Sequence, residues 1–164
     1  MEALDWHAAA HADRLHIHLY TDGQQEEQIS YGALRREAGA VAAALAQRKL
    51  ERGQRVAIML PTSRGYFLAF FGTLLAGGVP VPLYPPVRPS QLEEHLRRHV
   101  GILTNAQAVF LITMPEAKPL AEWLRARADS LRDVLTVDEM TATGAPTPEP
   151  APLKAQDIAL LQYT

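Results

Sequence analysis

Residues Val56-Ala57-Ile58-Met59-Leu60 form the stretch that decides the fold of this chain. The stretch is apolar at every position, which is typical of a strand covered on both faces of a sheet. An amphipathic segment at 64–76 follows, and then Val79-Pro80-Val81-Pro82-Leu83. Strand, helix and strand in this order form the unit of a parallel sheet. Because Pro80 and Pro82 cannot donate ladder hydrogen bonds, we expect the second strand at an edge or in an irregular position.

The same alternation continues toward both ends of the chain. Hydrophobic spacing predicts helices at 3–13 and 32–49, a helix capped by Ser90 and Glu93, and a helix that opens at Pro115. Further strands are expected at 108–112, 134–137 and 158–161. Upstream, 16–20 and 28–31 flank Asp22-Gly23, a turn sequence that predicts a β-hairpin.

These elements predict an α/β fold with three layers, a mainly parallel sheet with helices on both faces, and an N-terminal β-hairpin. We divide the chain into an α/β subdomain at 1–140, a proline-rich loop at 141–155 and a strand at 156–164. The strands at 56–60, 79–83, 108–112 and 158–161 are expected in one sheet. Ligands of such sheets bind beyond the carboxyl ends of the strands.

Composition excludes several classes of protein. The 164 residues are 48% hydrophobic and 21% charged with a net charge of −2, so no broad attraction to nucleic acid is indicated. The absence of cysteine excludes disulfides and thiolate metal sites and is typical of the cytoplasm. Neither a signal peptide nor a membrane span is indicated, because glycines and prolines interrupt the most apolar stretch.

Histidine spacing does not favour a metal site. His7/His11 and His95/His99 are helical i,i+4 pairs, but neither pair has the nearby glutamate of a zinc-protease helix. We therefore interpret them as solvent-facing or half-buried side chains and predict no metal ligand. No catalytic residue is assigned within this chain.

Three motifs, in order, resemble those of the adenylate-forming enzymes. Ile29-Ser30-Tyr31-Gly32-Ala33-Leu34 resembles the first core motif, although Ala33 stands where glutamate is common. The segment 74–83, which ends Val79-Pro80-Val81-Pro82-Leu83, resembles the second. Ala159-Leu160-Leu161-Gln162-Tyr163-Thr164 resembles the entry to the third, a glycine-rich phosphate loop whose glycines are missing here. Within the superfamily, Tyr84-Pro85-Pro86 and Gln162-Tyr163-Thr164 are most similar to fatty acyl-AMP ligases.

The resemblance implies the first part of the large N-terminal domain of a ligase. It implies that the parent enzyme uses ATP and Mg²⁺ to convert a fatty acid into acyl-adenylate, then passes the acyl group to an acyl carrier protein. Gln162, Tyr163 and Thr164 are the implied cofactor-binding residues, because a phosphate cradle needs free backbone N–H groups after a strand. The 164-residue piece alone is expected to be inactive and to hold no cofactor.

Two alternatives stay open. An acyl-CoA synthetase would use CoA in place of the carrier protein, and a non-catalytic α/β module would bind a nucleotide or a protein partner. The sequence of the piece also predicts self-association, since an apolar strand at 158–161 normally has neighbours on both edges. We expect a homodimer with two-fold symmetry.

Overall fold

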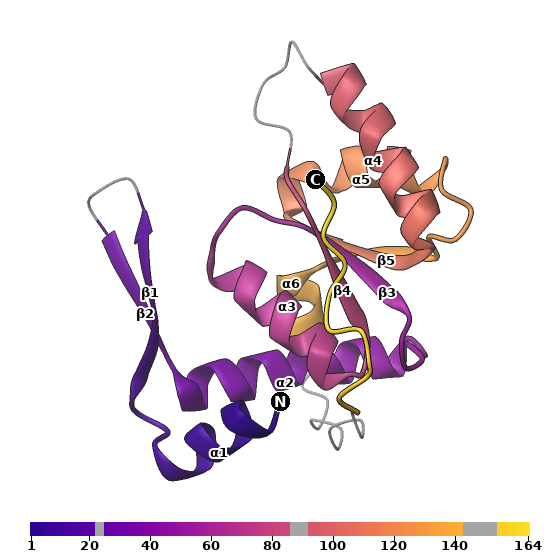
Figure 1. Ribbon diagram of the computed structural model, residues 1–164. Coiled ribbons are helices and arrows are strands. Elements are labelled where there is room, and N and C mark those ends of the chain that lie inside the picture. Colours follow the sequence, from indigo (N-terminus) through magenta and orange to yellow (C-terminus); the bar gives the residue numbers. More distant parts are fainter. Residues whose placement is uncertain (22–24, 86–91, 143–153) are drawn as a thin grey trace.

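A computed structural model describes residues 1–21, 25–85, 92–142 and 154–164 of the chain (Figure 1). The elements, in order, are α1 (Glu2–Ala10), β1 (Leu15–Thr21), β2 (Gln25–Ser30), α2 (Tyr31–Gln47), β3 (Arg55–Met59), α3 (Arg64–Leu75), β4 (Val79–Leu83), α4 (Leu92–Ala106), β5 (Ala108–Thr113), the 3-10 turn η2 (Pro115–Ala117), α5 (Lys118–Arg125), β6 (Asp133–Thr136) and α6 (Val137–Thr141).

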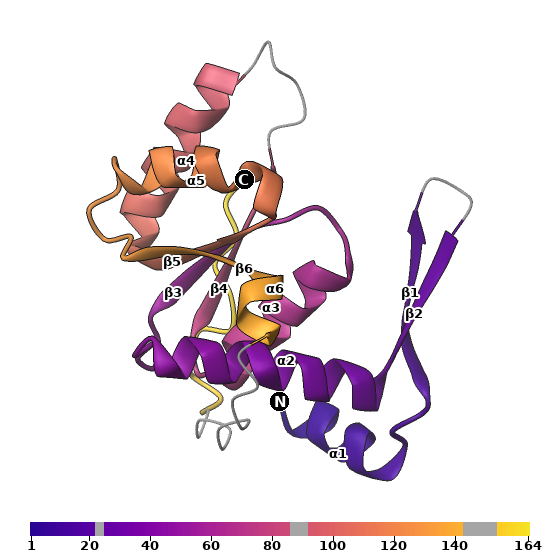
Figure 2. The same ribbon diagram turned by 180° about the vertical axis from the view of Figure 1, so that it is seen from behind.

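Four parallel strands form the central sheet in the order β4-β3-β5-β6. Side chains alternate between its faces, so that Val56 and Ile58 join a core with α2, α3 and α6. Ala57 and Met59 join a second core with α4 and α5. Figures 1 and 2 show these helix groups on opposite sides of the strands. The three-layer α/β fold and the parallel sheet are therefore confirmed.

Strand β4 lies at the edge of the sheet, as its prolines predict. The amide of Val79 donates toward Gln54, next to β3, whereas the carbonyl of Pro80 faces away from β3 and accepts from Leu161. Because backbone groups alternate along a strand, Pro80 and Pro82 both occupy outward-facing positions. The sheet thus loses no ladder hydrogen bond to either proline.

The β-hairpin joins the body at the start of α2. Ile29 is fully buried, and the Ser30 hydroxyl accepts from the Ala33 amide at 3.2 Å, which caps the helix. Tyr31 then stacks between the rings of His7 and His16, with centroids 4.3 and 4.2 Å away. The Ile29-Ser30-Tyr31 motif therefore has a structural role, in which it anchors the hairpin, caps α2 and holds α1.

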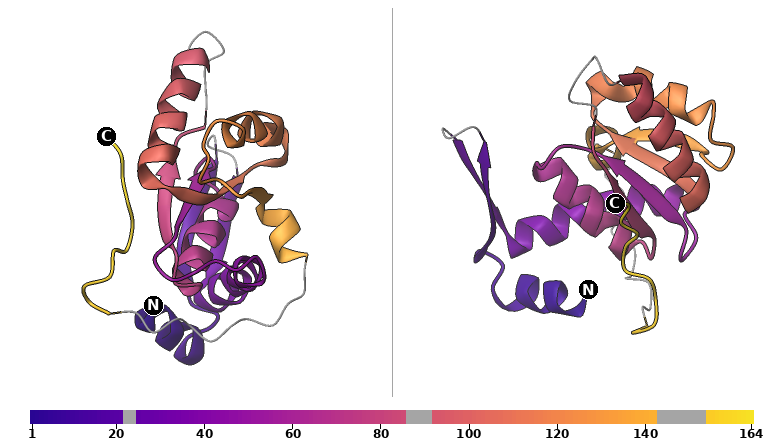
Figure 3. Two further views of the ribbon diagram at one scale, coloured as in Figure 1. Left: turned by 90° about the vertical axis from the view of Figure 1, so that its right-hand side faces the viewer. Right: turned by 45° about the horizontal axis from the view of Figure 1, so that its top comes forward.

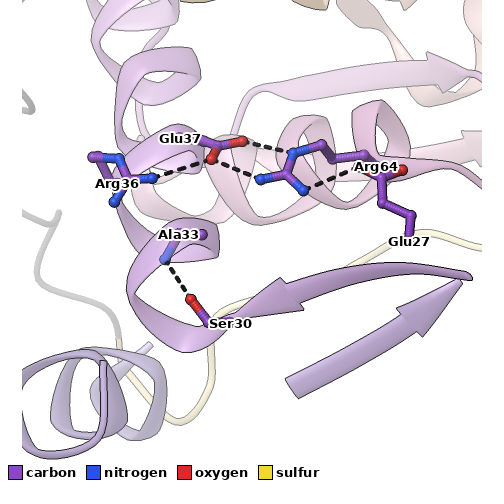
Figure 4. A network of polar contacts seen from close by, with 6 residues as sticks. All are labelled: Glu27, Ser30, Ala33, Arg36, Glu37 and Arg64. Atoms are coloured by element: carbon purple, nitrogen blue, oxygen red, sulfur yellow. Dashed lines mark hydrogen bonds and ion pairs between the residues drawn. The ribbon is translucent and has the colours of Figure 1, made fainter. Parts of the chain in front are cut away.

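An arginine at the start of α3 ties the hairpin to the helices (Figure 4). The Arg64 guanidinium donates to both carboxylate oxygens of Glu37 on α2, at 2.8 and 2.7 Å, and to Glu27 on β2 at 3.0 Å. The hydrogen bond to Glu37 is the main cause that raises the pKa of Arg64. One side chain thus connects the start of α3 to β2 and α2, with partners that are 37 and 27 positions earlier in the sequence.

Most predicted elements are confirmed, with end points that shift by a few residues. The helix at 3–13 ends at Ala10, the helix expected to open at Pro115 begins as a 3-10 turn, and the strand expected at 134–137 spans 133–136. Asp22-Gly23, Ser90 and most of the proline-rich loop lie outside the described residues. Sequence reasoning missed α6, whose capping box joins Thr136 and Glu139.

The strand predicted at 158–161 is wrong. Residues 158–164 form no strand and are not part of the sheet. The segment makes one backbone hydrogen bond to β4, from the Leu161 amide to the Pro80 carbonyl at 3.1 Å. The reason is chemical, since a strand beside β4 needs donors as well as acceptors, and outward-facing Pro80 and Pro82 have no N–H to donate.

Helices α2 and α3 approach so closely that a glycine is required between them. A Cβ atom on Gly72 would lie 2.6 Å from two side-chain atoms of Val41 and 2.9 Å from the Ala38 carbonyl oxygen. Gly101 on α4, in contrast, has no neighbouring atom within 4 Å of such a Cβ. The two helical glycines therefore differ in their steric surroundings.

We expect Gly72→Ala to lower the free energy of unfolding by about 1–3 kcal/mol, because the added methyl group overpacks the core. The matched control, Gly101→Ala, is expected to raise it by roughly 0.5–1 kcal/mol through helix propensity. Urea denaturation of both variants measures the two effects. Equal effects in the two variants would contradict the close approach of α2 and α3.

Candidate functional site at the carboxyl edge of the sheet

The carboxyl ends of the parallel strands meet at one edge of the sheet. Strand β3 leads into Pro61-Thr62-Ser63, and the Ser63 hydroxyl caps α3 by accepting from the Tyr66 amide at 3.3 Å. Strand β4 leads into Tyr84-Pro85, and β5 ends at Thr113. In open α/β sheets this edge is where ligands bind. The candidate functional site lies at this edge.

The C-terminal segment runs along the outside of β4 to this edge (Figure 3). It is attached at three points along its length. Asp157 forms an ion pair with Arg52, the Leu161 amide donates to Pro80, and the Tyr163 hydroxyl donates to the Asn105 side-chain oxygen at 2.6 Å. The backbone hydrogen bond from the Lys154 amide is the main cause that lowers the pKa of Asp157, and Arg52 adds to it.

The segment separates two cavities at the edge of the sheet. The first, of about 450 Å³, is mostly apolar and includes Tyr66, Phe67 and Phe70 of α3 in its lining. The second, of about 380 Å³, is lined by His95, Arg98, His99 and Ile102 of α4 on one side. Residues common to both linings are Pro82, Leu83, Tyr84, Gln162 and Tyr163.

The three residues predicted to bind the cofactor are thus brought to the carboxyl edge. Gln162 and Tyr163 line both cavities, whereas Thr164 lines only the cavity beside α4. Gln162 and Thr164 are exposed, and Tyr163 is half-buried. Their role in cofactor binding stays a prediction.

Helix α4 supplies a polar wall whose histidines the sequence predicted to be solvent-facing or half-buried. His99 is 3% exposed, and its Nδ1 lies 2.7 Å from the His95 carbonyl oxygen. His95 Nε2 lies 2.9 Å from the carbonyl oxygen of Tyr84, at the end of β4. Burial lowers the pKa of His99, so its ring is held neutral and donates to the backbone. The i,i+4 spacing of this pair was the available signal.

On the apolar side, Tyr66 belongs to a row of rings on α3. Its ring contacts Phe67 edge-on at 5.6 Å and stacks with Phe70 at 6.1 Å between centroids. Burial raises the pKa of the Tyr66 hydroxyl. The wall of the first cavity is therefore aromatic and neutral, which suits an apolar ligand.

The chemistry of the second cavity fits phosphate. Its lining includes Arg98, His95, His99 and Thr164, and no Asp or Glu is among the described residues that line it. Among the described residues, no group of three or more His, Cys, Asp or Glu side chains could hold a metal ion. A Mg²⁺ ion associated with ATP takes many of its ligands from the phosphates themselves, so its binding does not require such a group.

Comparison with known proteins decides the family. The model of the AMP-binding enzyme family matches residues 4–164. This chain belongs to the AMP-binding enzyme family. The resemblance to adenylate-forming enzymes is confirmed, and so is the similarity to the fatty acyl-AMP ligase branch.

Relatives within the AMP-binding enzyme family include fatty-acid ligases. The chain is 37% identical over 128 residues to the long-chain-fatty-acid–AMP ligase FadD32 of Mycolicibacterium smegmatis, a match that covers 76% of this chain and 20% of that protein. It is 29% identical over 148 residues to the medium-chain-fatty-acid–[acyl-carrier-protein] ligase JamA of Moorena producens, which covers 87% of this chain and 24% of JamA.

A solved structure supports the same assignment. A chain from "Structural and Functional Studies of Fatty Acyl-Adenylate Ligases from E. coli and L. pneumophila" superposes with a TM-score of 0.84 and 32% sequence identity, covering 99% of this chain and 29% of the solved one. The chain spans about a fifth to a quarter of the length of the curated relatives described above. Within the described ranges, no helix is both long and apolar enough to cross a bilayer.

The neutral state of His99 predicts a pH dependence of stability. Because burial lowers its pKa in the folded protein, the unfolded chain binds the extra proton below about pH 6.5. The free energy of unfolding should therefore fall as the pH drops from about 7.5 to 5.5. In His99→Gln this component should be absent, as measured by urea titration at both pH values.

The matched control for this pH experiment is His11→Gln, at an exposed position outside the carboxyl edge. It should retain the pH dependence of the wild type. A His99→Gln variant with the same loss of stability as the wild type at low pH would contradict the neutral, buried His99.

Proposed function

We propose that this chain is part of a ligase that activates a fatty acid with ATP. In the reaction, a carboxylate oxygen of the acid attacks the α-phosphorus of ATP, and the bond from that phosphorus to the β-phosphate bridging oxygen breaks. The products are acyl-adenylate and pyrophosphate. The observation that carries the proposal is the 37% identity to a fatty-acid–AMP ligase over three quarters of the chain.

The two cavities support this substrate pair. The cavity with the aromatic α3 wall offers an apolar surface to a fatty acyl chain, and the cavity with Arg98 offers cationic and hydroxyl groups to phosphates. Gln162 and Tyr163 line both, so they would lie where acid and nucleotide meet. When bound, Mg²⁺ would offset phosphate charge, the Arg98 guanidinium would add positive charge, and the Thr164 hydroxyl could donate a hydrogen bond to a phosphate oxygen.

For the acyl acceptor we propose the phosphopantetheine arm of an acyl carrier protein. The relative JamA is named as an acyl-carrier-protein ligase, which supports this choice. A second candidate is CoA, because a putative fatty-acid–CoA ligase of Mycobacterium tuberculosis is 30% identical over 120 residues. The proposed compartment is the cytoplasm, in keeping with the absence of cysteine.

We expect the gene product at its natural length to catalyse ATP–pyrophosphate exchange that depends on added fatty acid. The 164-residue chain alone should show no exchange above a control without protein. The reason is that this chain lacks the glycine-rich phosphate loop that its resemblance implies. Measuring radioactive pyrophosphate incorporation over a series of acid chain lengths tests both statements. Pyrophosphate exchange by the 164-residue chain would contradict its predicted inactivity. A natural-length product that shows no exchange with any acid would contradict the proposed activity.

We also propose that the 164-residue chain self-associates through residues 158–161, which lie beside β4. Ile158 and Leu160 of this segment are 61% and 40% exposed. Exposed apolar side chains in one segment favour contact with a second copy of the chain. A symmetric dimer would cover both copies at once.

Light scattering at several concentrations of the 164-residue chain should therefore reveal a dimer. Leu160→Asp should shift the equilibrium toward monomer, because the substitution places a charge in the apolar contact. The control Tyr20→Asp changes an exposed ring on the hairpin, away from β4, and should leave the dimer intact. A wild-type chain that is monomeric at every concentration contradicts the proposal.

A further inference from the structure

Tyr163 stands at the junction of the two cavities, and a residue from another element holds its hydroxyl. The Tyr163 O–H donates to the Oδ1 atom of Asn105 at 2.6 Å, across 58 positions of sequence. Asn105 lies in the last turn of α4, a helix whose buried face packs against β5 and β3. The acceptor is therefore an exposed side chain on a regular helix, whereas the donor belongs to an irregular segment.

The C-terminal segment has few other restraints at this end. Between Leu161 and Thr164, the hydrogen bonds to the described part of the body are the Leu161–Pro80 backbone bond and the Tyr163–Asn105 bond. The ion pair of Asp157 with Arg52 lies at the opposite end of the segment, and both side chains are partly exposed. An exposed ion pair of this kind restrains a chain weakly.

We infer that Asn105 is a positioning residue that, through the Tyr163 hydroxyl, sets the path of residues 161–164 along the carboxyl edge. Because Tyr163 lines both cavities, its position determines the boundary between the apolar cavity and the basic one. Asn105 itself lines neither cavity, so its effect on a ligand is transmitted by Tyr163. The consequence for nucleotide binding rests on the proposed function.

The contact requires a hydrogen-bond acceptor at position 105, and asparagine is not the only residue that can supply one. An Asn Oδ1 accepts one hydrogen bond from the phenol, and an aspartate oxygen at the same position can accept it as well. Alanine cannot accept the bond, and phenylalanine at 163 cannot donate it. Asn105→Ala and Tyr163→Phe therefore each remove the hydrogen bond from one side, and Asn105→Asp should restore it.

The first test asks, in the absence of any ligand, whether the Asn105 contact holds residues 161–164 in place. Hydrogen exchange of the Leu161 amide, followed by NMR in the 164-residue chain, reports on its bond to Pro80. Loss of one neutral hydrogen bond predicts roughly 2- to 10-fold faster exchange in Asn105→Ala. Tyr163→Phe should give the same increase, and the double variant should add little, because both changes remove one contact.

The controls separate positioning from general loss of structure. Thr104→Ala changes an exposed neighbour on α4 and should leave the Leu161 exchange rate unchanged. Asn105→Asp should restore the wild-type rate. Amide exchange in the centre of β3 should remain as in the wild type in every variant, since the sheet does not depend on this contact. Unchanged Leu161 exchange in both Asn105→Ala and Tyr163→Phe overturns the inference.

The second test uses the gene product at its natural length. Asn105→Ala should raise the KM for ATP about 2- to 10-fold with kcat nearly unchanged, and Asn105→Asp should reverse this. A purely structural role would lower kcat in proportion to the active fraction, leaving KM unchanged. An active protein with unchanged KM in Asn105→Ala overturns the effect on nucleotide binding. A wild type that neither binds nor uses ATP refutes the proposed function. The hydrogen exchange of the Leu161 amide still decides, in that case, whether Asn105 positions the segment.

Discussion

The rest of the structure depends on the burial of β3 on both faces and both edges. Its neighbours β4 and β5 pair with it in parallel, and its side chains alternate between two hydrophobic cores. A parallel strand needs a crossover helix to reach its neighbour, so this pairing forces α3 onto one face and α4 onto the other. All carboxyl ends then meet at one edge, where the cavities lie.

The outer side of β4 imposes the second constraint. Its prolines present carbonyl oxygens without donors, so the sheet can bind a neighbouring segment there only through acceptors. The C-terminal segment consequently depends on side chains for its position, with Asn105 and Arg52 as partners. A chain held in this way can carry residues to the edge of the sheet without becoming a strand of it.

The sequence predicted elements correctly where a local pattern, such as an apolar run or a turn sequence, agreed with the packing of the folded chain. The apolar run at 56–60 required two covered faces, and Asp22-Gly23 separated two strands that do pair as a hairpin. The sequence prediction failed at 158–161, where the apolar run is largely exposed and the neighbouring side of β4 has no free donors with which a strand could pair. It placed His95 correctly as a half-buried side chain, but it missed the full burial of His99, which depends on the packing of α4.

The sequence by itself determined the α/β class, the edge position of β4 and the family, because periodicity, proline chemistry and short motifs are all local properties. Only the tertiary structure decided which side chains meet at the carboxyl edge. The contacts of Tyr163 with Asn105 and of Arg64 with Glu37 join residues that are 58 and 27 positions apart. No local pattern encodes such pairs, since they arise from the direction and register in which the helices pack on the sheet.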